Sequence, residues 1–201
     1  MKKQVGQKQP VVIAIIAVVV LGLVGLLIWR LTTKDEGEYQ QMGATAQCGD
    51  VFQCIEQLDP NSGLEDMNAL IGSDAEVDRQ TDDAIIYKWT IAADTTIEAR
   101  FSTYDDAGET KTLVTFNVHY PESIVPHNAD LSRWEEIQTK MGEENGINYE
   151  EMVEMVGGAK GLIDEKSQNT TGYRWFDKDD HYLSASFDNA TGKCTFATAD
   201  V

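Results

Sequence analysis

The chain has 201 residues, of which 34 are acidic and 16 are Lys or Arg, so its formal net charge at neutral pH is −18. That balance argues against nucleic-acid binding, which needs clustered cations, and against docking on an anionic lipid surface. Hydrophobic residues make up 42% of the chain, an ordinary globular share that excludes wholesale disorder.

Charge is distributed unevenly along the sequence. Residues 1–34 hold five cations and no acid, so residues 35–201 hold the other eleven cations and all 34 acids, a net charge of −23. Between the basic ends, residues 11–29 form an uncharged run interrupted only by Gly and Ala. As a helix with a rise of about 1.5 Å per residue, this run nearly spans the hydrocarbon core of a bilayer. We therefore expect a transmembrane helix over residues 11–30.

Three alternatives to an uncleaved membrane helix fit this apolar run less well. A cleaved signal peptide has a shorter apolar region with a small-x-small site soon after it, whereas the first such triplet here is residues 44–46. A lipoprotein needs a cysteine directly after the run, and Cys48 is distant. A core helix so apolar would be unusual in so polar a chain. We expect an uncleaved signal anchor in the cell membrane, with residues 1–10 as a cytoplasmic basic tail and residues 35–201 extracytoplasmic.

Residues 31–47 lack apolar periodicity and are expected to form a polar stalk. Cys48 and Cys54 follow, and in an extracytoplasmic compartment a disulfide between them would persist. Such a bridge requires Cys48 to precede the helix that contains Cys54, and the sequence leaves open whether it forms. Cys194 is expected to be buried, and no zinc-ligand spacing is present in the sequence.

An internal repeat with an offset of 85–86 residues is the most informative feature of the sequence. The matching segments are 64–72 and 149–157, 87–89 and 173–175, and 96–101 and 182–187. Three blocks in one order with a nearly constant offset are hard to obtain by coincidental strand-like alternation.

Each copy begins with two helical patterns. Apolar residues in 64–71 and in 149–156 follow the stripe of a short amphipathic helix that ends at a glycine. Asn148 is expected to cap the second of these helices, with Glu151 completing a capping box. Further helices are expected over 51–58 and over 131–141, the latter capped by Asp130.

Each copy continues with alternating apolar residues that predict antiparallel strands. The clearest strands are expected around 85–89, 97–101, 112–119, 173–175, 183–187 and 193–198, with weaker first strands around Val77 and Ile163. The predicted fold class is α+β: an N-terminal transmembrane helix, then two tandem helix-helix-strand repeats that form a sheet covered on one face by helices. The expected repeats span 48–120 and 130–201, joined by a linker over 121–129.

This arrangement resembles the tandem β-lactamase-inhibitor-protein-like (BLIP-like) fold. The resemblance is carried by a helix ending in glycine, a Tyr-x-Trp strand and a strand ending in Phe-Asp-Asn, best seen in 149–157, 173–175 and 183–189. Outer-membrane assembly lipoproteins of the SmpA/OmlA type share the helix–helix–strand unit. The resemblance covers roughly residues 48–200 and implies a non-enzymatic protein that binds other proteins through the exposed face of its sheet.

Successive side chains of a strand point to opposite faces of the sheet. If the residues that share a face with Trp89 and Trp175 contact the helices, the alternate residues of the same strands face solvent. The candidate interaction residues in those rows are Lys88, Glu98, Arg100, Arg174, Phe176, Ser184 and Ser186. A solvated sheet face explains this pattern, and so does a partner-binding surface built around Arg100, Arg174 and Phe176. The face is mostly charged or small, unlike the aromatic-rich face of the β-lactamase inhibitors.

No catalytic motif is present in the sequence, so we expect no enzyme, no cofactor and no small-molecule substrate. The three histidines are scattered, and the acidic turn 177–181 (DKDDH) lacks the Gly and Glu of a calcium loop, so no metal site is expected. The leading hypothesis is a membrane-anchored extracytoplasmic module that binds an envelope or secreted protein. The alternatives are an inhibitor of a secreted or envelope hydrolase, steered by acidic charge, and a structural envelope spacer.

Overall fold

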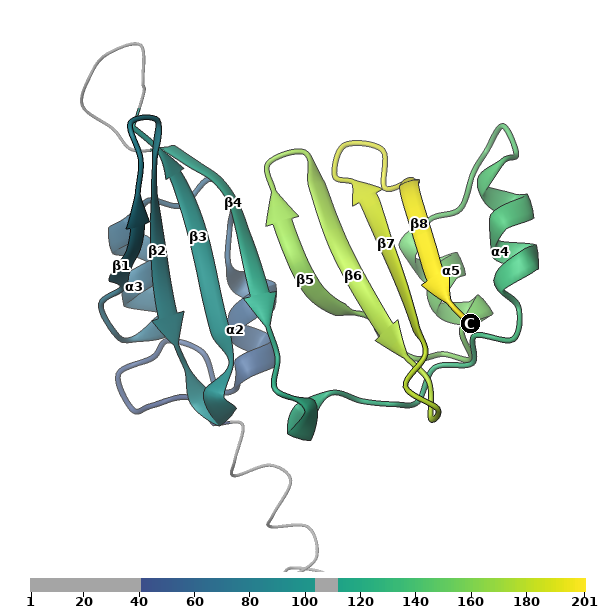
Figure 1. Ribbon diagram of the computed structural model, residues 1–201, viewed down its shortest axis with the longest axis horizontal. Coiled ribbons are helices and arrows are strands. Elements are labelled where there is room, and N and C mark those ends of the chain that lie inside the picture. Colours follow the sequence, from purple (N-terminus) through teal and green to yellow (C-terminus); the bar gives the residue numbers. More distant parts are fainter. Residues whose placement is uncertain (1–40, 104–111) are drawn as a thin grey trace, which may run out of the picture. The chain divides into compact units, whose positions relative to one another are not determined.

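A computed structural model describes residues 41–103 and 112–201 (Figure 1). The first elements are the helices α2 (Val51–Gln57) and α3 (Leu64–Ile71) and the strands β1 (Glu76–Gln80), β2 (Ala84–Thr90), β3 (Thr96–Ser102) and β4 (Thr112–His119). The later elements are the helices α4 (Trp134–Met141) and α5 (Tyr149–Met155) and the strands β5 (Leu162–Ser167), β6 (Thr170–Phe176), β7 (Tyr182–Asp188) and β8 (Cys194–Asp200). Short 3₁₀ turns lie at Ala92–Asp94 and at Glu122–Ile124.

The eight strands form one sheet in chain order, and every neighbouring pair is antiparallel. The joint between β4 and β5 consists of three residue pairs: Thr115 with Ser167, Phe116 with Lys166 and Asn117 with Glu165. This joint links strands that are separated by residues 120–161. The sheet therefore continues across the boundary between the two copies of the sequence repeat.

The expected fold class is wrong as a description of this structure. The described residues form a single eight-stranded antiparallel sheet with four α-helices, rather than two tandem units. None of the helices in 41–103 and 112–201 is long and apolar enough to cross a bilayer. The helix expected over 11–30 lies outside the described residues. The physical reason for the single sheet is the β4–β5 pairing, which joins backbone groups of both copies and leaves no signal in local periodicity.

Glycine ends helix α3 for a steric reason. Gly72 has φ +81°, and a Cβ added there would lie 2.3 Å from the backbone nitrogen of Ala46. No other residue fits that approach, so the helix stops where its apolar stripe ends. Helix α5 begins at the expected capping box, in which Asn148 accepts from the Glu151 amide at 2.9 Å and the Glu151 carboxylate accepts from the Asn148 amide at 3.0 Å.

Helix α4 begins later than the sequence predicts. The Asp130 carboxylate accepts from the amide of Ser132 at 3.0 Å, which forms a local turn instead of a helix cap. Helical structure starts at Trp134, and Arg133 forms an ion pair with Glu136 at 2.7 Å along its first turn.

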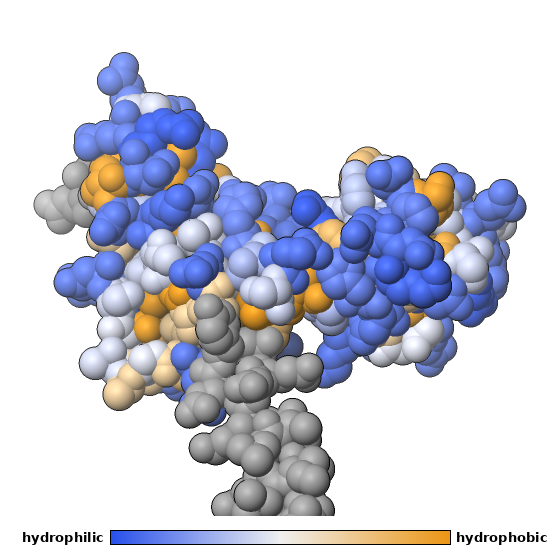
Figure 2. Space-filling model, turned by 60° about the horizontal axis from the view of Figure 1, so that its bottom comes forward, coloured by the Kyte–Doolittle hydropathy of each residue, from blue (hydrophilic) through white to orange (hydrophobic). Residues whose placement is uncertain are grey.

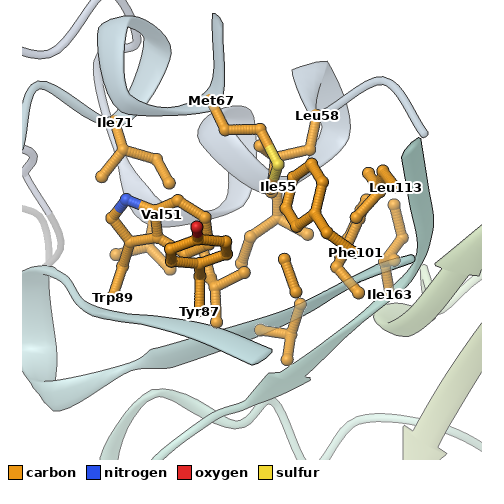
Figure 3. Packing of buried hydrophobic residues seen from close by; sticks show 14 of the residues in the cluster. Val51, Ile55, Leu58, Met67, Ile71, Tyr87, Trp89, Phe101, Leu113 and Ile163 are labelled. Carbon is orange, nitrogen blue, oxygen red and sulfur yellow. The ribbon is translucent and has the colours of Figure 1, made fainter. Parts of the chain in front are cut away.

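Two hydrophobic clusters lie between the helices and the sheet. In the first, Val51, Ile55, Met67 and Ile71 from α2 and α3 point toward inward rows of β2 to β4 (Figure 3). In the second, the buried residues of α4 and α5, including Ile137 and Met152, pack on β6 and β7. Each cluster contains a tryptophan that is 2% exposed, Trp89 in the first and Trp175 in the second.

The two buried indoles find their acceptors in different ways. Trp89 Nε1 donates to Oδ1 of Asn68 at 3.0 Å, and the same oxygen accepts from the amide of Ala75 at 3.1 Å. Trp175 Nε1 donates to the backbone carbonyl of Ala159 at 3.0 Å. A substitution of Asn68 therefore removes the hydrogen-bond acceptor of Trp89. The acceptor of Trp175 is a backbone carbonyl, which no side-chain substitution removes.

A disulfide between Cys48 and Cys54 joins the segment before α2 to the helix. Asp50, between them, caps α2 by accepting from the Gln53 amide at 2.9 Å. Cys194 is a free, half-buried cysteine, and burial raises the pKa of its thiol.

We expect Asn68→Ala to lower the free energy of unfolding by about 2 kcal/mol, because the buried Trp89 indole and the Ala75 amide lose their shared acceptor. Urea unfolding followed by tryptophan fluorescence measures this change. Glu65→Ala, at an exposed position of the same helix, is the control and should change the free energy by less than about 0.5 kcal/mol. Equal effects of both substitutions would contradict the role of Asn68.

Replacing both Cys48 and Cys54 by Ser should lower the free energy of unfolding by about 2 kcal/mol, since the bridge closes a short loop in the unfolded chain. The same urea titration checks this, with Cys194→Ser as the control. A double variant with an unchanged unfolding midpoint would show that the bridge does not contribute to stability.

Candidate functional site

Within the described residues, the sheet has one face covered by helices and one face without them, which we call the open face. The candidate residues lie on the open face, as the strand registers show. Lys88 pairs with Glu98, Arg174 with Ser184, and Phe176 with Tyr182. Arg100 and Ser186 complete the set, opposite Ile86 and Gly172 respectively. Arg100 and Arg174 are exposed, and the other five candidates are half-buried.

The three cations among the candidate residues already have carboxylate partners. Lys88 lies 3.7 Å from Glu98, and Arg100 lies 3.3 Å from Asp83. Arg174 lies 2.8 Å from a carboxylate oxygen of Asp164. The two arginines singled out in the sequence therefore present paired rather than free charge, which reduces their attraction for an acidic partner.

A bulge in β5 shapes the middle of the open face. The register shifts between Ile163 and Glu165, so Asp164 is an extra residue and Leu162 faces the open side opposite Arg174. Gly172 leaves room for the carboxylate, because a Cβ there would lie 3.0 Å from Oδ1 of Asp164. Sequence alternation alone places Asp164 in the regular pattern and misses this arrangement.

A small cavity lies at this bulge. It has a volume of about 120 Å³. Its lining residues include His119, Val125, Leu162, Asp164, Arg174 and Phe176. Apolar walls surround the Asp164–Arg174 pair. Burial raises the pKa of Asp164 above its ordinary value of 3.8, and the nearby Arg174 and His119 only partly oppose this shift.

Aromatic side chains lie at two places on the β6 to β8 part of the open face. Phe176 and Tyr182 have ring centroids 6.5 Å apart, and the Arg174 guanidinium lies 5.8 Å from the centroid of Tyr182. Phe196 of β8 pairs with Ser186 and is 58% exposed. Phe196 lies four residues farther along the strands from Tyr182, and we call Arg174, Phe176, Tyr182 and Phe196 together the aromatic patch.

Sequence reasoning did not identify Phe196 or Tyr182 as part of this face. A second bulge shifts the register of β8, so that Cys194 pairs with Phe187 while Phe196 pairs with Ser186. The available signal was a large aromatic residue in a strand otherwise made of small residues. On the side that Figure 2 shows, most of the surface is hydrophilic, with hydrophobic residues in patches between the hydrophilic ones.

Metal-ligating side chains gather at the β6–β7 hairpin. The two groups found among the described residues are Glu122, His127 and Asp180, and Asp177, Asp179 and His181. His119 belongs to neither group and lies on β4 at the cavity of the open face.

In comparisons with known proteins, no protein-family model matches the chain, and no curated protein or solved structure matches it. The resemblance to the BLIP-like fold and to the SmpA/OmlA-type lipoproteins therefore stays a prediction from the sequence.

The raised pKa of Asp164 gives a pH-dependent prediction. The stability that protonated Asp164 provides is fully present below its unfolded pKa and is lost as the pH rises through the higher folded pKa. Asn cannot ionise, so the free energy of unfolding of Asp164→Asn relative to wild type should increase from pH 3 to pH 7. We expect an increase of about 1 kcal/mol or less, measured by urea unfolding at both pH values.

Asp83→Asn is the matched control, because Asp83 also has an arginine partner but is exposed. A side-chain hydrogen bond from Thr81 lowers the pKa of Asp83, so its stabilising effect is present above the unfolded pKa and is lost as the pH falls through the folded pKa. Asp83→Asn should therefore show the opposite sign. The same sign in both variants would mean that burial does not govern Asp164.

Proposed function

We propose that this chain is a protein-binding module that engages an envelope or secreted protein through the open face of its sheet. The aromatic patch is the observation that carries the proposal. Arg, Phe and Tyr are enriched at protein interfaces, so aromatic side chains on an uncovered sheet face are candidates for binding hot spots.

The neighbouring cavity strengthens the proposal. Arg174 and Phe176 belong both to the aromatic patch and to the walls of the cavity, so the two features are contiguous. A volume of about 120 Å³ suits one inserted side chain rather than a small-molecule ligand. Since interface hot spots commonly fill pockets, the cavity would receive an apolar anchor residue of the partner.

Membrane attachment of this module through residues 11–30 is a proposal from the sequence. The Cys48–Cys54 disulfide supports an oxidising, extracytoplasmic compartment for the part that follows. Fractionation with alkaline carbonate tests the attachment, because an anchored chain stays in the membrane pellet. Release into the supernatant would contradict it.

Binding through the open face can be tested by site-specific photocrosslinking in cells. A photoreactive residue at Ser186, beside Phe196, should give a discrete adduct, whereas one at Glu65 of α3 should not. Phe196→Ser should lower the yield of this adduct about thirtyfold, because removal of a hot-spot side chain worth about 2 kcal/mol weakens partner binding by that factor. Arg174→Ala should lower the adduct yield less, because that side chain already forms an ion pair with Asp164.

Val77→Ser is the matched control for Phe196→Ser. Val77 is 59% exposed, close to the 58% of Phe196, but it lies on β1 at the opposite edge of the sheet. The control should leave the adduct unchanged. Two results would refute the open face as the binding surface. One is equal crosslinking from the position of Glu65, and the other is an unchanged adduct yield in Phe196→Ser.

A further inference from the structure

His127 lies in the segment that connects β4 with α4, and oxygen atoms face both of its ring nitrogens. Nε2 lies 2.8 Å from a carboxylate oxygen of Glu122. Nδ1 lies 3.1 Å from Oδ1 of Asp180 and 3.2 Å from the backbone carbonyl oxygen of Asp177. The ring also packs against Phe176, with centroids 5.7 Å apart, and its side chain is 24% exposed.

This environment suits a cation. A neutral imidazole has one N–H and one nitrogen lone pair. If Glu122 accepts the Nε2 proton, the lone pair of Nδ1 points toward two oxygen atoms that are themselves acceptors. Those contacts are repulsive unless a positive ion lies among them. A metal ion among them would accept the lone pair of Nδ1 and attract both oxygen atoms.

We propose that His127 Nδ1, the Asp180 carboxylate and the Asp177 carbonyl oxygen form a binding site for a divalent transition metal of the zinc class. Ligand atoms about 2.0–2.2 Å from such an ion are about 3.0–3.4 Å from one another, and the two distances at Nδ1 lie within that range. Glu122 is then an outer carboxylate that accepts the other N–H and fixes the tautomer of the metal-binding ring.

The surroundings of the site favour zinc over calcium. A second imidazole is close by on the same hairpin, since His181 Nδ1 lies 3.1 Å from Oδ2 of Asp177. Imidazole nitrogen suits zinc, copper and nickel, whereas calcium and magnesium take oxygen ligands. His127, His181, Asp177 and Asp179 line an open depression of about 610 Å³, which leaves room for water to complete the coordination.

The site unites parts of the chain that are distant in sequence. Glu122 and His127 belong to the connecting segment, whereas Asp177 and Asp180 belong to the β6–β7 hairpin. A bound ion would therefore fasten the connecting segment to the hairpin. Binding of this ion does not depend on the proposed protein partner, so either proposal can fail without the other.

Isothermal titration of the full-length chain with zinc chloride, in detergent micelles at pH 7.5, tests the site. We expect one ion per chain with a dissociation constant in the micromolar range or tighter. His127→Gln and Asp180→Asn should each weaken zinc binding at least about tenfold, and Glu122→Gln should weaken it less. Zinc should also raise the thermal unfolding midpoint of the wild type but not that of His127→Gln.

His119→Gln is the matched control, because His119 lies outside both clusters and its removal should leave zinc affinity unchanged. Circular dichroism spectra establish that each variant is folded. The proposal is overturned if zinc binds His127→Gln as tightly as the wild type. It is equally overturned if calcium binds as tightly as zinc, which would indicate carboxylates alone, or if zinc does not bind.

Discussion

The pairing of β4 with β5 is the interaction on which the rest of the structure depends. Its three residue pairs are reinforced by two side chains: Lys166 Nζ donates to the Leu58 carbonyl at the end of α2 at 2.8 Å, and the Tyr120 hydroxyl donates to the Ile163 carbonyl at 2.8 Å. A cation is favourable at a helix C-terminus. The joint makes the open face continuous and brings together walls of the central cavity that come from both strands, such as His119 and Leu162.

Much of the local structure could be predicted because it depends on local chemistry. The alternation of Ile85, Tyr87 and Trp89 gives a buried row on β2, and the Asn148 capping box starts α5 where expected. The start of α4 could not be predicted, since Asp130 satisfies its carboxylate in a turn that competes with the helix cap. The pairing of β4 with β5 was not predicted, because a strand register between distant segments is set by tertiary packing.

The candidate site was less accessible to sequence reasoning than the fold. Strand alternation assigned Lys88, Arg100 and Arg174 to the uncovered face, but it could not show that each is paired with a carboxylate. The bulges of β5 and β8 changed which residues face outward, and alternation carries no information about a bulge. His127 could not be connected with 177–181 either, since that contact arises only when the connecting segment reaches the hairpin.

The chain-ordered sheet has a consequence for how the protein folds. When each strand pairs with its neighbour in sequence, most pairings close short loops, and the conformational entropy lost at each step is small. The exception is the pairing of β4 with β5, which closes a loop that contains residues 120–161. The strands β1 to β4 and the strands β5 to β8 should therefore each form early, and the pairing of β4 with β5 should be the slow step. A chain emerging from synthesis can thus complete β1 to β4 before β5 exists, with the edge of β4 temporarily open to an unintended strand.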